Sequence, residues 1–227
     1  MKYSFLLFVF LIISCSNTVN YTPEFKAKTE GTYLYSLDET IEVSYNDKNE
    51  ISVLWRGVDV RPIAIDQNTF TSVEMNKKLR FIKHPETNTM YLTDVTEDDN
   101  KIAYDYKKMP ENFNVPSVHL KNKNYTEALK GYLAIQKEDS TSVYINEYHF
   151  NKYGYKLMRD ENYKDAIEVL KINAALYPES DNVYDSLGDA YLKIGDSLNA
   201  FNNFKKSLEF NNGNKKAKRF VEAYNKA

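Results

Sequence analysis

The sequence predicts an α+β protein, with an N-terminal antiparallel β-sheet rolled into a sandwich or small barrel and an all-helical array after it. Two observations carry this prediction. Between residues 31 and 109, short runs of aromatic and β-branched residues recur about every ten residues and are separated by turn residues. Between residues 151 and 217, apolar residues follow a helical period, and the whole pattern recurs once at a fixed offset. We therefore expect domains at 31–109 and 110–227.

Composition and net charge by themselves exclude few classes of protein. The chain has 227 residues, 42% of them hydrophobic, which is enough for packed cores. It contains 30 Lys and Arg and 32 Asp and Glu, which gives a formal net charge of −2. This balance predicts neither a nucleic-acid binder nor a strongly acidic protein, so specific contacts must define the partner.

The N-terminus has the pattern of an export signal. Lys2 precedes an unbroken apolar run at 5–13, which is shorter than the roughly 20 residues that a membrane-spanning helix needs. The pattern predicts a signal peptide over residues 1–14. The tetrapeptide at 12–15 (Ile-Ile-Ser-Cys) resembles a bacterial lipobox, which implies cleavage before Cys15 and lipid, palmitate included, on that residue.

Lipid at Cys15 would anchor the mature protein to a membrane of the bacterial cell envelope without spanning it. Cys15 is the only cysteine, so it has no disulfide partner within this sequence, and the alternative to lipidation is an unmodified thiol. Residues 15–30 show neither helical nor strand periodicity and are predicted to be a lipidated tether.

Seven segments of the β domain alternate as strands do. They are 31–36, 40–45, 50–55, 58–65, 79–84, 89–95 and 101–107. Their inward-facing aromatic residues would either line a cavity for an apolar ligand or fill the core, and a small barrel interior favours core filling. These aromatic residues are Tyr33, Trp55, Phe70, Phe81 and Tyr91.

Evidence for a metal site is weak. Acidic and polar residues match part of a calcium-loop template, namely Asp94, Thr96, Asp98, Asn100 and Asp105. However, Asp99 replaces the turn glycine and Asp105 replaces the bidentate glutamate. The three histidines are far apart in sequence (His84, His119 and His149). We predict a solvated acidic turn, no metal and no cofactor.

The helical half contains two copies of one helical hairpin, at 147–180 and 181–214. Equivalent residues match between the copies, namely Gly154 with Gly188, Ala166 with Ala200, and Leu170 with Phe204. The glycines and alanines would let paired helices approach closely, and Leu170 and Phe204 would fill the space between units. This pattern resembles the tetratricopeptide (TPR) repeat, and its offset equals the TPR period. We expect a degenerate unit at about 117–140 and a basic, solvating cap helix at 215–227.

A further resemblance covers residues 30–227. Segments 151–158, 166–178, 182–196 and 202–211, with Gly31-Thr32-Tyr33, are similar to the β domain and TPR tail of Bacteroidetes-type serine hydrolases of the β-lactamase or penicillin-binding class. That catalytic chemistry needs a serine followed three residues later by lysine. The sequence contains no Ser-x-x-Lys and no Gly-x-Ser-x-Gly. The chain therefore resembles the accessory part alone, and we expect no enzymatic activity and no catalytic residue.

The first helices of the two full units should face a concave groove. Eight residues are predicted to contact a partner there: Tyr148, Asn151, Tyr155, Arg159, Asn182, Asp185, Asp189 and Lys193. Asp185 and Asp189 lie one helical turn apart and would suit a cation or a basic peptide; a merely solvated face is the alternative.

The sequence as a whole predicts a membrane-anchored envelope lipoprotein that binds a protein or peptide and no nucleic acid. One alternative is a carrier or sensor that holds a small apolar ligand in the β domain. Another is an accessory subunit of a serine hydrolase or other envelope complex.

Overall fold

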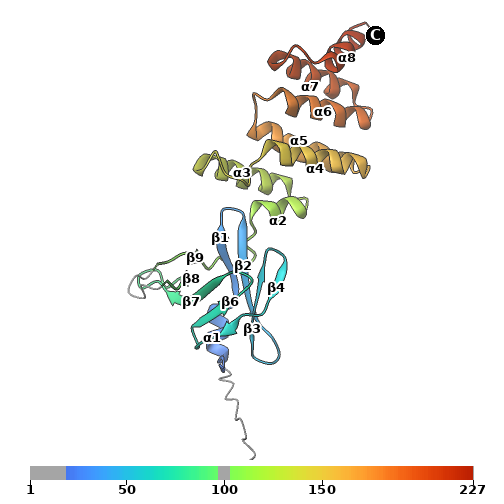
Figure 1. The fold of residues 1–227 in the computed structure, drawn as a ribbon. Coiled ribbons are helices and arrows are strands. Elements are labelled where there is room, and N and C mark those ends of the chain that lie inside the picture. The colour runs from blue at the N-terminus through green and yellow to red at the C-terminus, as the bar shows by residue number, and fades with distance from the viewer. Residues whose placement is uncertain (1–18, 97–102, 227) are drawn as a thin grey trace, which may run out of the picture. The chain divides into compact units, whose positions relative to one another are not determined.

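The computed structural model describes residues 19–96 and 103–226 (Figure 1). These residues form two compact units, which together give an α+β protein. The first unit runs through Tyr35 and resumes over Thr40–Glu111, and the second takes Ser36–Glu39 and continues from Asn112. The predicted signal peptide and Cys15 lie outside the described residues. Within the described residues, no helix is long and apolar enough to cross a membrane.

The first unit consists of a short helix and two antiparallel sheets. The four-stranded sheet has the order β1-β2-β3-β4 and the five-stranded sheet the order β5-β6-β7-β8-β9. The elements are α1 (Pro23–Thr29), β1 (Gly31–Ser36), β2 (Glu39–Tyr45), β3 (Ile51–Trp55), β4 (Val58–Val60), β5 (Ile63–Ala64), β6 (Thr69–Ser72), β7 (Lys77–Lys83), β8 (Met90–Asp94) and β9 (Tyr106–Lys107).

Among the described residues, pairing joins the two sheets along one side. A bridge pairs Tyr33 with Lys108, and Met109 N donates to Thr32 O at 2.8 Å, so β1 lies beside the end of β9. On the other side β4 and β5 are the end strands of their sheets, and only Arg61 and Pro62 separate them in sequence. The described strands therefore form a rolled sheet in which β4 and β5 are not paired with each other.

The sequence prediction missed one strand and merged two others. The predicted strand at 58–65 is divided into β4 and β5, because Pro62 has no N–H to donate to a ladder. β6 has only four residues, Thr69–Ser72, three of them polar, too short and too polar a run to show alternation. This segment is a strand because it pairs with β7, and the sequence pattern alone does not show that pairing.

The predicted tether is wrong from residue 19 onward. Pro23–Thr29 forms α1, which is capped where Phe25 N donates to Thr22 Oγ1 at 3.2 Å. Tyr21 is 4% exposed, and the ring of Phe25 packs edge-on against Phe81. Periodicity could not reveal this segment because so short a helix offers only about two turns to analyse.

Side chains fill the interior of the first unit, as the small-barrel argument favoured. Tyr33 and Phe70 are fully buried, and Phe81 is 5% exposed. Trp55 is only partly buried at the margin of this core. The inward orientation predicted for Tyr91 is wrong: Tyr91 is only partly buried and lies outside the core cluster, whereas Leu92, on the other side of the strand, is 0% exposed.

The acidic residues of the calcium template hold the sheet together where they are described. Asp94 Oδ2 accepts hydrogen bonds from Lys77 Nζ at 2.6 Å and from Tyr106 Oη at 2.7 Å. Asp105 Oδ2 accepts from Thr93 Oγ1 at 2.8 Å. Asp98 and Asn100 lie outside the described residues. Across the ranges 19–96 and 103–226, no three His, Cys, Asp or Glu side chains are grouped as a metal would require.

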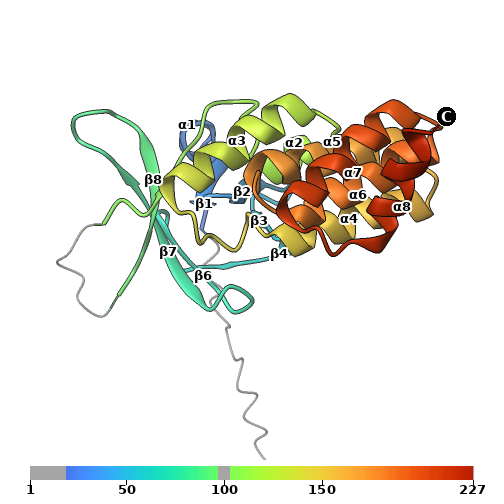
Figure 2. The ribbon, with the colours of Figure 1, turned by 90° about the horizontal axis from the view of Figure 1, so that it is seen from above.

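The second unit is a stack of helical hairpins (Figures 1 and 2). Its helices are α2 (Pro116–Lys121), α3 (Tyr125–Glu138), α4 (Glu147–Arg159), α5 (Tyr163–Leu176), α6 (Asp181–Lys193), α7 (Ser197–Phe210) and α8 (Lys215–Tyr224). The hairpins α4–α5 and α6–α7 coincide with the two repeats that the sequence predicted. Helix α2 has only six residues, in keeping with a shortened first helix in the degenerate unit.

The glycine positions of the repeats are packing sites. A Cβ added to Gly154 would lie 2.7 Å from Leu170 Cδ2, and one added to Gly188 would lie 2.6 Å from Phe204 Cε1. Leu170 and Phe204 therefore pack first on the partner helix of their own hairpin. Leu170 also belongs to the cluster that reaches Val183 of the next hairpin, which is the contact between units that the sequence predicted.

Candidate functional site

The first helices of the two full hairpins, α4 and α6, bring repeat-related side chains together. Tyr155 Oη donates to Asp189 Oδ2 at 2.9 Å, and these two residues are equivalent in successive repeats. Tyr155 also lies 3.4 Å from Ser186 Oγ, which donates to it. The pKa of the Tyr155 hydroxyl is raised, mainly because the hydroxyl is buried. It therefore stays protonated at neutral pH and serves as a fixed hydrogen-bond donor.

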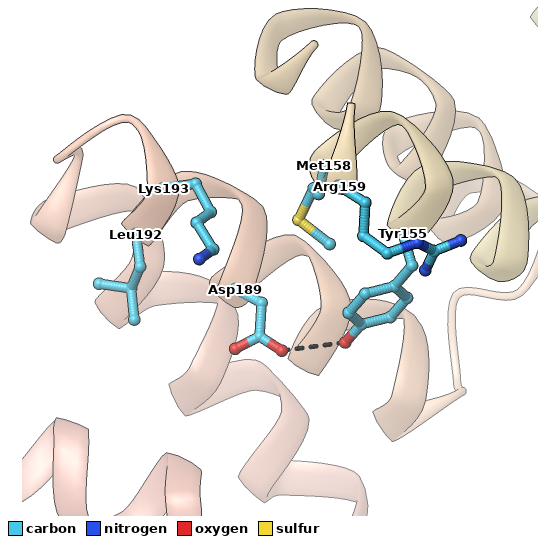
Figure 3. A pocket seen from close by; sticks show the side chains of 6 residues that line it. All are labelled: Tyr155, Met158, Arg159, Asp189, Leu192 and Lys193. Atoms are coloured by element: carbon cyan, nitrogen blue, oxygen red, sulfur yellow. Dashed lines mark hydrogen bonds between the residues drawn. The ribbon is translucent and has the colours of Figure 1, made fainter. Parts of the chain in front are cut away.

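A recess of about 550 Å³ opens between these two helices (Figure 3). Helix α4 contributes Tyr155, Met158 and Arg159, and helix α6 contributes Asp189, Leu192 and Lys193. Met158 is 7% exposed whereas Leu192 is 37% exposed. The recess therefore has an apolar part large enough for a side chain and a polar rim.

The rim carries two cations of the same repeat position. Arg159 and Lys193 correspond to each other as Gly154 corresponds to Gly188, and each lies in the last turn of its helix. Both are exposed, and no hydrogen bond or ion pair joins either one to another described residue. Both charges are therefore available to a ligand.

The two carboxylates behave differently, because the cap helix already supplies a cation. Lys216 Nζ lies 2.8 Å from Asp185 Oδ2 and 2.7 Å from Asp189 Oδ2. Burial lowers the pKa of Lys216, but its hydrogen bonds to both carboxylates outweigh that effect and raise the pKa above its usual value. Asn214 Nδ2 also donates to Asp185 Oδ1 at 2.7 Å. A basic ligand would have to displace Lys216 from Asp185 and Asp189.

The other predicted groove residues lie on the same helices but outside the recess. Tyr148 is 67% exposed. Asn182 Nδ2 is committed to Glu147 Oε1 at 2.9 Å. Asn151 Oδ1 is buried and accepts no hydrogen bond from the described residues.

Sequence reasoning missed three participants. Met158 and Leu192 also occupy equivalent repeat positions, so the repeat itself could have identified them as a pair. Lys216 gave no such signal, because α8 was predicted only as a solvating cap. Lys216 binds two carboxylates of α6 that are distant in sequence: Asp189 is 27 residues before it and Asp185 is 31 residues before it.

Parts of three solved structures are similar to about half of this chain. The chain is similar to the first TPR of Spaghetti (RPAP3) bound to the HSP90 peptide SRMEEVD, at 17% identity over 49% of this chain and 85% of that one, with a TM-score of 0.34. It is similar to MamA at 22% identity over 49% of this chain and 59% of MamA, with a TM-score of 0.33. It is also similar to the Arabidopsis OM64 TPR domain, at 16% identity over 49% and 88% of the two chains, with a TM-score of 0.34.

No protein-family model matches the chain, and no curated protein sequence does. The helix pairs of the second unit repeat at the TPR period and pack through Gly154 and Gly188, which is the geometry that the TPR resemblance predicts.

Proposed function

We propose that this protein is a non-enzymatic binding module of the bacterial envelope, anchored by lipid at Cys15, whose TPR groove holds a segment of a protein or peptide. The recess between α4 and α6 is the observation that carries the proposal. It combines an apolar interior with hydrogen-bonding groups that are fixed in advance, which is the composition of a ligand site.

The charges of the groove define the segment it would bind. Arg159 and Lys193 pair with no other described residue, whereas Lys216 neutralises the carboxylates of Asp185 and Asp189. The segment therefore carries a carboxylate beside an apolar side chain: the apolar group enters against Met158, and the carboxylate meets Arg159 and Lys193. This polarity is the opposite of the one that the sequence alone favoured for the acidic pair.

Synthetic peptides test this assignment. We would measure binding of fluorescent decapeptides that end in Leu-Glu, with matching Leu-Lys peptides, to the full chain. Replacing both cations (Arg159→Gln with Lys193→Gln) should weaken binding of the acidic peptides by tenfold or more, because two charge-assisted contacts contribute about 1.4 kcal/mol or more together. The Leu-Lys peptides should bind weakly to either protein.

A matched control separates the groove from general charge. The double variant Lys156→Gln with Lys218→Gln removes the same charge from exposed positions that do not line the recess. It should bind the acidic peptides as the unchanged protein does. Equal losses in both double variants, or no loss in either, would contradict binding in the groove.

The anchor has its own test. Expressed with its leader in a bacterial host, the protein should carry lipid on Cys15, seen as added acyl mass on the N-terminal peptide, and should fractionate with membranes. Cys15→Ser should abolish both. A membrane-bound Cys15→Ser protein, or an unmodified cysteine in the natural chain, would refute the lipoprotein proposal.

Two alternatives rank lower. The resemblance to the tail of serine hydrolases makes such an enzyme, or another envelope complex, a candidate partner, and co-purification of a labelled serine hydrolase would support that choice. The interior of the β unit is filled by its own side chains, Tyr33, Phe70, Leu79 and Leu92 each being 0% exposed. No observation on this core therefore favours a carrier for an apolar ligand.

A further inference from the structure

The described chain is fixed to the β unit from its first residues. Val19 packs against the core cluster, and Tyr21 is 4% exposed, with its ring 4.9 Å from that of Tyr45. Asn49 Nδ2 donates to Asn20 Oδ1 at 2.7 Å, which ties this segment to the β2–β3 turn. Only residues 16–18 therefore separate Cys15 from the folded unit in sequence.

This short separation limits the distance between the unit and its anchor. An extended chain advances at most about 3.3–3.6 Å per residue, so the four steps from Cys15 to Val19 span no more than about 14 Å. A tether reaching to residue 30, as the sequence predicted, would have extended several times farther. A lipid on Cys15 therefore places the end of the β unit that carries Val19 against the membrane surface.

That end of the unit exposes apolar side chains. Val19 lines a recess of about 530 Å³ together with the link between β4 and β5. Ile63 in this lining is 64% exposed, and Ile65 beyond it is 48% exposed. Because Ile63 pairs with Thr71, the turn after β6 lies at the same end of the sheet, and its Val73 is 80% exposed. Exposed β-branched residues beside free strand edges are normally avoided in proteins that remain in water.

The charges of the recess limit which kind of surface would suit these apolar residues. Lys48 and Arg61 line the recess, but so do Glu50 and Asp59, so the lining is balanced in charge. Attraction to anionic headgroups or to a nucleic acid would need an excess of cations. The surface instead suits the apolar boundary of a bilayer, into which shallow side chains insert whatever the headgroup charge.

We infer that the end of the β unit carrying Val19, Ile63 and Val73 docks on the lipid surface that holds Cys15. The inference rests on the proposed lipidation and adds to it an orientation: the β unit lies on the bilayer through this end. Ile63 and Val73 then insert into the interface, and Lys48 and Arg61 stay at headgroup level.

Site-directed fluorescence on the lipidated full chain tests this orientation. Lipid blocks the thiol of Cys15, the only natural cysteine, so a new cysteine can be labelled alone. We would place a polarity-sensitive dye at Ile63→Cys or Val73→Cys, with Thr87→Cys as the control. Thr87 is exposed in the turn after β7, at the opposite end of that strand from the turn that carries Val73.

In phosphatidylcholine vesicles we expect a blue shift at positions 63 and 73, quenching there by lipid-borne quenchers, and neither effect at position 87. Adding phosphatidylglycerol should change nothing. Water-exposed dyes at 63 and 73, equal shifts at all three positions, or a shift only with phosphatidylglycerol would overturn the docking surface. Mass spectrometry of the same samples separates the two proposals: absence of lipid on Cys15 refutes the anchor, whereas lipid with a water-exposed position 63 refutes the docking alone.

Discussion

The β unit and the helical unit bury their apolar residues in different ways. In the β unit, residues from α1 and from strands of both sheets form one cluster, from Tyr21 to Leu92. In the helical unit the buried residues divide into three clusters that follow one another along the stack. The last contains only Ala200, Phe204 and Ala217 as fully buried members.

This difference determines how far the loss of stability caused by one substitution extends through each unit. A repeat contacts only its neighbours, so a helical array loses stability locally and frays from its ends. A rolled sheet with one core has no such subdivision and should unfold as a single cooperative body. Three substitutions test the contrast, in order of decreasing effect.

Phe70→Ala should have the largest effect. The ring is fully buried and lies 5.5 Å from that of Phe81, and removing a buried phenyl ring costs about 3–5 kcal/mol. We expect amide hydrogen exchange to rise in every strand from β1 to β9, not only in β6 and β7. Val73→Ala at an 80% exposed position is the control and should stay within about 0.5 kcal/mol. Faster exchange confined to β6 and β7 would refute the single core.

Phe204→Ala should cost about 3 kcal/mol, at the low end for a phenylalanine core residue, because its neighbour Phe220 is only partly buried and has room to move inward. Hydrogen exchange should rise in α6, α7 and α8 and remain unchanged in α3. Phe210→Ala, at a 44% exposed position of the same helix, should have little effect. Loss of protection reaching α3 would show that the array is more cooperative than its clusters indicate.

Lys216→Met should have the smallest effect, about 1 kcal/mol, because Lys216 is 44% exposed and its ion pairs are partly screened by solvent. The pKa of Lys216 is raised in the fold, so its contribution is complete below the ordinary lysine pKa of about 10.4 and disappears as pH rises through the raised value. Thermal unfolding curves of variant and wild type should therefore differ at pH 7 and converge in strong alkali. As a control, Lys218→Met at an exposed neighbouring position should give the same thermal unfolding curve as wild type at both pH values.

The sequence anticipated the helical unit well because its information is repeated. Gly154 and Gly188 give the same signal twice, and a helix hydrogen-bonds within itself, so local pattern is enough to predict it. The β unit was less predictable. β6 is short and exists because β7 pairs with it, and the split at Pro62 depends on which sheet each half joins. Strand partners are distant in sequence, and period-2 alternation carries no information about them.

The candidate site shows the same division. The sequence by itself determined that Tyr155 and Asp189, and likewise Arg159 and Lys193, occupy equal positions in successive repeats, because a fixed period fixes which residues share a face. Only the tertiary structure decided the charge of the groove, because Lys216 comes from a helix outside the repeat and neutralises Asp185 and Asp189. The packing of Val19 and Tyr21 likewise shortens the predicted tether. The charge of the groove and the length of the tether both depend on contacts between residues that are distant in sequence, and neither periodicity nor composition predicts such contacts.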